Sequence, residues 1–232
     1  MRWSITCQNL WTNFLQIMEN NNFTAYQFEN YDVEGLKLEI NFLNTDFIEI
    51  KTHEEINSPI ENIEESFEPL LFGIDMNITN IRNVNDLRGK KMILLDGHHR
   101  YEYLKRNNFE KSIEIVLISI DDVEILSYPS RLTIRKKEFE DILKNYNFSN
   151  NVSSKFFVSV DDVKFFNEEI LDIYQLYEFK NFCYVNEYIS SAVDENKTND
   201  EIIVNFTPIE VSEIVENDSL FPPKSTWITP RL

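Results

Sequence analysis

The sequence predicts an α+β fold, in which a mixed sheet carries a strand–helix–strand unit and a smaller lobe follows toward the C-terminus. Three observations predict this fold. Residues 36–42 alternate between apolar and polar side chains with a period of two, which indicates a half-buried strand. Residues 91–120 indicate a strand, a helix and a second strand in succession. Two stretches that begin at Ser58 and Thr207 combine a capping residue, a Pro and a Glu, as is typical of helix starts.

The elements before residue 91 follow from local patterns. Residues 47–51 predict a second strand, which runs directly into His53-Glu54-Glu55. The stretch that starts at Ser58 predicts a helix that ends near Phe72-Gly73. Its buried face is formed by apolar residues at helical spacing, which are Ile60, Ile63, Phe67, Leu70 and Leu71.

The stretch 91–120 predicts the clearest supersecondary unit of the chain. Met92–Leu95 is an apolar strand, Asp96-Gly97 is a turn, His98–Asn107 is a helix, and Ile113–Ile120 is another apolar strand. A strand–helix–strand unit of this length predicts a parallel pair of strands with a right-handed crossover.

The second half of the chain is less regular, and its composition suggests a boundary. The predicted elements in order are a helix at about 135–145, an Asn/Ser-rich loop at 145–154, a strand and then a helix around 160–177, a polar linker at 193–200, and a helix that starts at Thr207. We therefore expect a core of residues 1–145 with an N-terminal extension, and an aromatic-rich C-terminal lobe of residues 146–232.

Composition restricts the class of function. The chain has 232 residues with 42% hydrophobic and 13% aromatic content, which is enough to bury a core. Only 22 basic residues face 40 acidic ones, and the net charge of -18 disfavours nucleic acid as a partner. We expect no signal peptide, no membrane-spanning helix and no membrane partner. Cys7 and Cys183 lack metal-ligand spacing and predict reduced thiols in a cytoplasmic protein.

The run Asp96-Gly97-His98-His99-Arg100 follows the predicted strand and opens the predicted helix. Glycine permits the tight or left-handed backbone of such a turn. The first amides of a helix have no intrahelical acceptor and carry partial positive charge, so they bind anions. Arg100 can add a bidentate contact to phosphate oxygens, and Asp96 can hold Mg²⁺ or orient a reacting group. The run therefore indicates a phosphate-binding turn.

The residues of this run are also compatible with two other interpretations. In the first, Asp96 caps the helix while the two histidines pack beneath it. In the second, His53, His98 and His99 form a zinc site, although adjacent histidines point in different directions and no Cys pair assists them. The four glycines form neither a Walker loop nor a Gly-x-Gly-x-x-Gly motif, so the standard nucleotide folds do not apply.

Two further motifs carry functional groups. His53-Glu54-Glu55 follows a strand, and a carboxylate there can act as a general base for a hydroxyl nucleophile, although an acidic pair is more often solvated surface. Lys224-Ser225-Thr226 can bind a phosphate or carboxylate with its ammonium, hydroxyls and amides. The preceding Leu220-Phe221-Pro222-Pro223 favours a docked segment over a mobile tail.

Taken together and in this order, the three motifs resemble the free L-serine kinase family, which has the ParB/sulfiredoxin-like fold. That family shows a His-Glu-Glu element, then Asp-Gly-His-His-Arg at the start of a helix, and finally Phe/Leu-Pro-Pro-Lys-Ser/Thr-Thr. The counterparts here are His53–Glu55, Asp96–Arg100 and Phe221–Thr226. The resemblance covers residues 45–130 and 207–227.

The resemblance implies a kinase that transfers a phosphoryl group from ATP or ADP to the hydroxyl of free L-serine, with Mg²⁺ as the metal and O-phosphoserine as the product. It implies three catalytic residues, namely Glu54 as the base, with Glu55 as the alternative base, Asp96 as the metal ligand, and His98. It also implies that the strand–helix–strand unit is a nucleotide-binding core and that residues 219–227 return to the active site. The implied phosphate-binding residues are Gly97, His98, His99 and Arg100, and the implied substrate-binding residues are His53, Glu55, Tyr128, Lys224, Ser225 and Thr226.

This chain also departs from the family pattern. The family often continues with Thr-Arg-His after its Pro-Pro-Lys-Thr run, whereas this chain has Thr226-Trp227-Ile228, so one basic contact is absent from the motif. Tyr128 stands where the family tends to have a Trp that frames the substrate.

Related families suggest other functions. Sulfiredoxins carry a reactive Cys at the position of His98, which excludes their chemistry, and ParB-type partition proteins append basic DNA-binding helices that this acidic chain lacks. A family of uncharacterised proteins combines Asp-Gly-His-His-Arg-Tyr with Pro-x-Lys-Ser-Thr-Tyr/Trp, which Tyr101 and Trp227 also match. The alternative functions are therefore a non-catalytic nucleotide- or metabolite-binding regulator with the same fold, or an interaction module built on residues 155–190.

Overall fold

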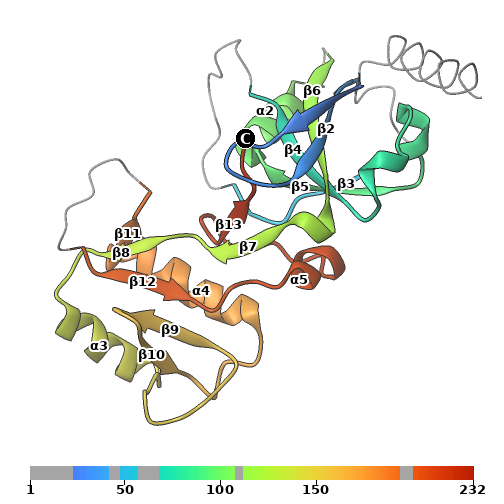
Figure 1. Ribbon diagram of the computed structural model, residues 1–232. Helices are drawn as coiled ribbons and strands as arrows, with labels where there is room; N and C mark the ends of the chain where they lie inside the picture. The colour runs from blue at the N-terminus through green and yellow to red at the C-terminus, as the bar shows by residue number, and fades with distance from the viewer. Residues whose placement is uncertain (1–22, 42–47, 57–67, 108–111, 194–200) are drawn as a thin grey trace, which may run out of the picture. The chain divides into compact units, whose positions relative to one another are not determined.

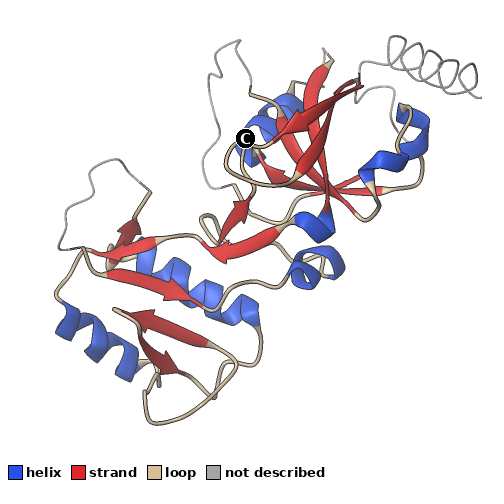
Figure 2. Ribbon diagram, in the orientation of Figure 1, coloured by secondary structure: helices blue, strands red, loops and turns tan. Residues whose placement is uncertain are grey.

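The computed structural model describes residues 23–41, 48–56, 68–107, 112–193 and 201–232, which form two compact units. Unit 1 comprises Met1–Thr52, Ser58–Val123 and Pro230–Leu232, and unit 2 comprises His53–Asn57 and Glu124–Thr229. Figure 1 colours the chain by residue number, and Figure 2 distinguishes its helices from its strands. The architecture is α+β, as the sequence predicts.

The division into units differs from the boundary at residues 145/146 that the sequence suggests. Segment His53–Asn57 belongs to unit 2 although unit 1 flanks it on both sides in the sequence. The change of unit near residue 123 has a structural reason, since the strand at Ser130–Leu132 pairs with strands from much later in the chain. The Asn/Ser-rich stretch is a loop inside unit 2, where Ser149 and Phe166 form an isolated antiparallel bridge.

Unit 1 is built on a six-stranded mixed sheet in the order β1-β2-β6-β4-β5-β3. Its strands are β1 Phe23–Gln27, β2 Glu34–Ile40, β3 Glu49–Lys51, β4 Leu70–Ile74, β5 Lys91–Asp96 and β6 Ile113–Ser119. The pairs β3–β5 and β4–β6 are parallel, and the other pairs are antiparallel. Helix α2 (His98–Arg106) follows β5, and the short 3₁₀ turns are η2 Ile78–Asn80, η3 Val84–Leu87 and η4 Ile120–Asp122.

Strand β4 corrects two expectations. The predicted helix does not continue to Phe72, because Leu70–Ile74 is a strand with all five residues buried. A short, continuous apolar run cannot be distinguished from a buried helical face by periodicity alone. The start of that predicted helix, residues 58–67, lies outside the described residues. β4 also separates β5 from β6, so these two strands run antiparallel and are not the parallel pair that the sequence suggests.

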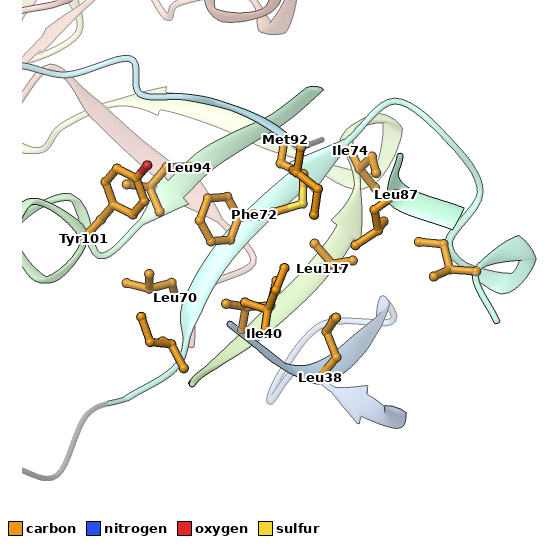
Figure 3. Close-up of a cluster of buried hydrophobic side chains, with 14 of the residues drawn as sticks. Leu38, Ile40, Leu70, Phe72, Ile74, Leu87, Met92, Leu94, Tyr101 and Leu117 are labelled. Atoms are coloured by element: carbon orange, nitrogen blue, oxygen red, sulfur yellow. The ribbon is translucent and has the colours of Figure 1, made fainter. Parts of the chain in front are cut away.

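The core of unit 1 lies where α2 meets the sheet. Figure 3 shows Tyr101 from α2 beside Phe72 from β4 and Leu94 from β5. The Tyr101 and Phe72 rings meet edge to face with their centroids 6.3 Å apart. The other buried members of this cluster come from every strand or its flanks, and they include Leu38, Ile40, Ile74, Leu87, Met92 and Leu117. This packing fixes α2, and with it the turn that precedes α2, against the sheet.

Unit 2 is built on a five-stranded antiparallel sheet in the order β10-β9-β12-β8-β11, and a two-stranded ribbon pairs β7 with β13. The strands are β7 Glu124–Ser127, β8 Ser130–Leu132, β9 Phe157–Val160, β10 Val163–Phe166, β11 Ile189–Ser191, β12 Ile203–Phe206 and β13 Thr226–Thr229. The helices are α3 Lys136–Asn145, α4 Ile173–Val185 and α5 Val211–Glu216. Helix α4 packs against β11 and β12, and Figure 1 shows it behind the sheet.

Three predicted elements of unit 2 can be compared with the structure. The helix predicted near 135–145 is α3. The helix predicted around 160–177 is wrong, since β9 and β10 form a hairpin there and α4 begins only at Ile173. The hairpin turn has Asp161 and Asp162 at positive φ, which suits a tight two-residue connection. The last helix begins at Val211, after the predicted cap Thr207.

None of the described helices has the length and apolar character that crossing a membrane requires. Cys183 is a free, buried thiol of α4, and burial raises its pKa to about 12. Cys7 lies outside the described residues.

Candidate active site

The predicted phosphate-binding turn joins β5 to α2 in unit 1. Gly97 has a φ of 90°, in the left-handed region, and it is the residue that precedes the first helical turn. A Cβ at this position would lie 2.6 Å from Leu70 Cδ2, so the close approach of β4 also requires glycine. The first amides of α2 have no intrahelical acceptor, as in any helix. Local geometry therefore presents the helix start in the form that binds anions.

Asp96 does not cap helix α2, which was the alternative interpretation of this carboxylate. Its Oδ1 accepts a hydrogen bond from the neighbouring Gly97 amide at 2.9 Å. The same oxygen lies 3.3 Å from Nη2 of Arg231, at the C-terminal end of the chain. The carboxylate is thus held at the turn by one amide and one guanidinium.

Arg100 and Arg231 bring two guanidinium groups to the turn. Nη1 of Arg100 donates to the Glu68 carbonyl at 2.7 Å and lies 3.4 Å from the Glu68 carboxylate. Nη2 of Arg100 would lie 3.0 Å from a Cβ at Gly97, so this side chain packs across the turn. Arg231 was missed by the sequence analysis. One signal in the sequence could have pointed to Arg231, which is the single arginine after Arg135.

His98 is held neutral by its surroundings. Burial lowers the pKa of His98 to about 3, and the neighbouring His99 adds to this effect. Its side chain retains some solvent exposure, but the surrounding protein disfavours the imidazolium form. A neutral imidazole is therefore present at the start of α2 across the physiological pH range.

The segment that carries Glu54 is docked in unit 2 by backbone pairing. The Glu55 amide donates to the Phe221 carbonyl at 2.8 Å, and the Phe221 amide donates to the His53 carbonyl at 2.8 Å. Phe221 is fully buried and stacks on Tyr174, with ring centroids 4.2 Å apart. The expectation of a docked C-terminal segment is therefore confirmed for Phe221 and for β13.

The Glu54 carboxylate is bound by Thr226, which lies 172 residues later in the chain. Oε1 of Glu54 accepts from the Thr226 amide at 2.6 Å and from the Thr226 hydroxyl at 2.5 Å. Nε2 of His53 lies 3.0 Å from the same hydroxyl oxygen. Since this hydroxyl donates its one hydrogen to ionised Glu54, His53 must donate to it from a protonated Nε2.

Burial raises the pKa of Glu54, and several neighbouring groups oppose that effect. The Thr226 hydroxyl and amide lower the pKa, and so do the charge of Lys180 and the Ser225 amide. Desolvation is the larger influence. Glu54 therefore has the higher proton affinity that is expected of a general base.

Lys180 is a second functional candidate that the sequence analysis missed. It lies on α4 with only 1% of its surface exposed, and its Nζ donates to Ser127 Oγ and to the Tyr128 carbonyl, both at 3.0 Å. A third acceptor, the Ser225 carbonyl, lies at 3.4 Å. Burial lowers the pKa of Lys180 to about 7, although the charge of Glu54 acts in the opposite direction.

Of the other predicted substrate-binding residues, Lys224 and Ser225 occupy the turn that precedes β13, and Tyr128 directly follows β7. Lys224 is exposed at a φ of 60°, and its Nζ lies 5.6 Å from the Tyr184 ring centre. The Ser225 hydroxyl is fully buried and donates to the Pro222 carbonyl at 2.6 Å. The Tyr128 ring meets Trp227 edge to face at 5.6 Å, and the Tyr128 amide donates to the Ser225 carbonyl at 3.0 Å.

The predicted site residues thus gather into two groups, one in each unit. The unit 1 group consists of Asp96, Gly97, His98, His99, Arg100 and the added Arg231. The unit 2 group consists of His53, Glu54, Glu55, Tyr128, Lys224, Ser225, Thr226 and the added Lys180. Among the described residues, no three His, Cys, Asp or Glu side chains gather as a multidentate metal site would require. A Mg²⁺ ion that also binds phosphates requires fewer protein ligands, and Asp96 is the acidic side chain in the turn.

Comparison with known proteins finds similarity only at the level of structure. No protein-family model and no curated protein matches the sequence. SbnI with a C-terminal truncation, from Staphylococcus aureus, aligns at a TM-score of 0.51 and 12% identity, over 84% of this chain and 84% of that chain. This likeness shows a shared fold.

Two other solved structures align at lower TM-scores. A free serine kinase in complex with AMP aligns at 0.47 and 14% identity, over 88% of this chain and 90% of that chain. A conserved hypothetical protein from Pyrococcus furiosus aligns at 0.44 and 15% identity, over 85% of this chain and 91% of that chain.

Proposed function

We propose that this chain is a nucleotide-dependent phosphotransferase with an alcohol group as acceptor, and that it phosphorylates free L-serine with ATP or ADP as donor. The observation that carries the proposal is the environment of Glu54. This carboxylate is withdrawn from solvent, oriented by two hydrogen bonds from Thr226, and raised in pKa by burial. A general base works best when its pKa approaches the working pH.

Unit 1 supplies groups that suit the nucleotide phosphates. The left-handed Gly97 opens the helix start, and the Arg100 and Arg231 guanidinium groups lie at the turn. Asp96 would hold Mg²⁺, which neutralises phosphate charge when bound. Phosphoryl transfer depends mainly on such positioning and charge neutralisation.

In the proposed reaction, the serine hydroxyl oxygen attacks the terminal phosphorus of the donor. The O–P bond to serine forms as the P–O bond to the departing nucleotide breaks, and the hydroxyl proton passes to Glu54. His53 keeps the Thr226 hydroxyl directed at Glu54. The products are O-phosphoserine and the nucleotide with one phosphate fewer.

The first prediction concerns Glu54→Gln, which preserves the shape of the side chain and removes its basicity. We expect O-phosphoserine formation to fall about 10²–10⁴-fold, because proton transfer by a positioned base contributes that much. Nucleotide affinity, measured by calorimetry, should stay within about twofold. Glu178→Gln, the same substitution at an exposed residue of α4, is the matched control and should retain wild-type turnover.

Two outcomes would separate this proposal from the regulator hypothesis. Equal turnover in the wild type and Glu54→Gln would remove Glu54 from the chemistry. Nucleotide binding without turnover on any hydroxylated acceptor would instead favour a non-catalytic regulator.

A further inference from the structure

Lys180 is buried, and removing its charged ammonium from water is energetically unfavourable. Helix α4 buries six of its residues, and the other five are Ile173, Leu176, Tyr177, Phe179 and Cys183. The Lys180 ammonium lies 5.1 Å from the Tyr177 ring centre and 5.3 Å from that of Phe206. A buried charge is tolerated only when it is paired and hydrogen-bonded. The three oxygen acceptors of Lys180 meet that requirement.

These acceptors come from two separate chain segments. Ser127 and Tyr128 lie at the end of β7, and Ser225 lies directly before β13. The residue after Ser225 is Thr226, which donates both of the hydrogen bonds that orient Glu54. A single ammonium therefore links the two strands of the ribbon at the end where Glu54 is bound.

We propose that Lys180 is a positioning residue, whose ammonium holds the Ser225–Thr226 turn against the end of β7, and with it the Thr226 groups that bind Glu54, and whose positive charge favours the carboxylate form of Glu54. Its role as an aid to catalysis rests on the function proposed above. Its action on Glu54 is a property of the folded chain, and it can be measured without any substrate.

The titratable groups around Lys180 define the expected direction of its effect. The charge of Lys180 lowers the pKa of Glu54, and the charge of Glu54 raises that of Lys180. Tyr177 and Tyr184 stay neutral across the physiological range, since burial raises the pKa of both hydroxyls, that of Tyr184 to about 12. Nε2 of His53 lies 3.0 Å from the Thr226 hydroxyl that donates to Glu54. Glu54 and Lys180 therefore form a coupled pair.

The second prediction is that Lys180→Met raises the pH at which the Glu54 carboxyl titrates. We expect a shift of about one pH unit or more, which is a tenfold change in proton affinity. The measurement is ¹³C NMR of glutamate-labelled protein, with the Glu54 signal assigned from Glu54→Gln. Tyr177→Phe is the matched control, because it removes a buried polar group from the same helix without changing charge. An unchanged Glu54 midpoint in folded Lys180→Met would overturn the proposal.

A reciprocal measurement keeps the proposal testable if Lys180→Met fails to fold. Glu54→Gln retains the shape of the side chain, and in this variant the Lys180 midpoint should fall below its wild-type value of about 7. The measurement is a ¹³Cε titration of labelled lysine. An unchanged Lys180 midpoint would show that the two groups are not coupled, and it would also overturn the proposal.

Kinetics then separate a positioning role from a purely structural one. In Lys180→Met, the acid limb of the kcat/KM profile should move to higher pH together with the Glu54 midpoint, and kcat should fall more than KM changes. A structural role alone would lower activity equally at every pH. If no phosphoserine forms in any variant, the proposed function fails, while the two titrations still decide whether Lys180 controls Glu54.

Discussion

At the scale of single residues, burial adjusts the side chains that would perform the chemistry. It raises the pKa of Glu54, lowers that of Lys180 to about 7, and lowers that of His98 to about 3. Each shift moves the group toward its neutral form, as desolvation requires. The hydrogen bonds from Thr226 and the charge of Lys180 limit the shift of Glu54. The result is a carboxylate with a higher proton affinity than an exposed glutamate has.

The third prediction is that His98 stays neutral from pH 8 down to pH 5. Because its folded pKa lies below its unfolded value near 6.5, folding stability is present above pH 6.5 and is lost as the pH falls toward 3. At pH 5 the loss is about 2 kcal/mol. ¹⁵N NMR of the imidazoles checks the charge, and urea unfolding of wild type and His98→Gln at pH 5 and 7 checks the stability. A His98 midpoint near 6.5, or an equal acid loss in both proteins, would contradict the shift.

The sequence could predict only some of the site residues. Glu54 and Thr226 belong to recognisable motifs, and the resemblance implied that both belong to the active site, but their contact across 172 residues was not predicted. Lys180 sits in an aromatic stretch without a motif, and its burial depends on how α4 packs against the β7–β13 ribbon. Arg231 reaches Asp96 through tertiary structure, which no local pattern encodes.

At the scale of elements, two constraints act on the turn between β5 and α2, namely its backbone conformation and its contact with the neighbouring strand β4. Gly97 has a positive φ and lies against the buried side chain of Leu70. Gly89 also has a positive φ, of 68°, but a Cβ there would meet nothing within 4 Å. A Cβ at Gly89 would therefore cause backbone strain alone, whereas a Cβ at Gly97 would cause the same strain and also overlap with Leu70.

The fourth prediction compares alanine substitutions at these glycines. Gly89→Ala should cost about 1–2 kcal/mol, the penalty for a left-handed backbone with a Cβ. Gly97→Ala should cost about 3 kcal/mol or more, because Leu70 is held in a close-packed core and cannot move away freely. Urea unfolding measures both. Equal losses would show that the contact with Leu70 does not matter, and nucleotide affinity should fall only in Gly97→Ala.

The fifth prediction concerns the docking of the segment that carries Glu54. Phe221 is fully buried and pairs with the backbone of residues 53–55, whereas its neighbour Leu220 is 43% exposed. Phe221→Ala should destabilise the protein by about 3–5 kcal/mol. Leu220→Ala should change stability by less than about 0.5 kcal/mol. Urea unfolding of both variants provides the comparison, and similar losses would argue against the docked arrangement.

Elements with a strong local signal were predicted well, and those that depend on tertiary context were not. The alternation in β2, the apolar runs of β5 and β6, and the helices α2 and α3 were all visible in the sequence. The sequence predicts the end of a helix where β4 lies, because five consecutive buried residues have no period of two. The antiparallel relation of β5 and β6 arises because β4 inserts between them.

At the scale of the whole molecule, each unit includes a short segment whose neighbours in the sequence belong to the other unit. Residues 53–57 belong to unit 2 although unit 1 flanks them in the sequence, and residues 230–232 belong to unit 1 although they follow unit 2 in the sequence. The short segment that joins unit 2 carries Glu54, and the one that joins unit 1 carries Arg231. Neither placement has a signal in the composition of the sequence.

The net charge of -18 also belongs to this scale. Such an acidic chain repels polyanions in general, so a small anionic ligand depends on local groups such as the start of α2 and the Arg100 and Arg231 side chains. The proposed kinase therefore needs a specific nucleotide site within an acidic protein.

The most direct test of the central claim is mass spectrometry of isotope-labelled L-serine after incubation with the full chain, Mg²⁺ and either ATP or ADP. We expect labelled O-phosphoserine with at least one donor in the wild type, and a loss of about 10²–10⁴-fold in Glu54→Gln. Absence of labelled product from wild-type protein with both donors, under conditions where calorimetry shows bound nucleotide, would contradict it.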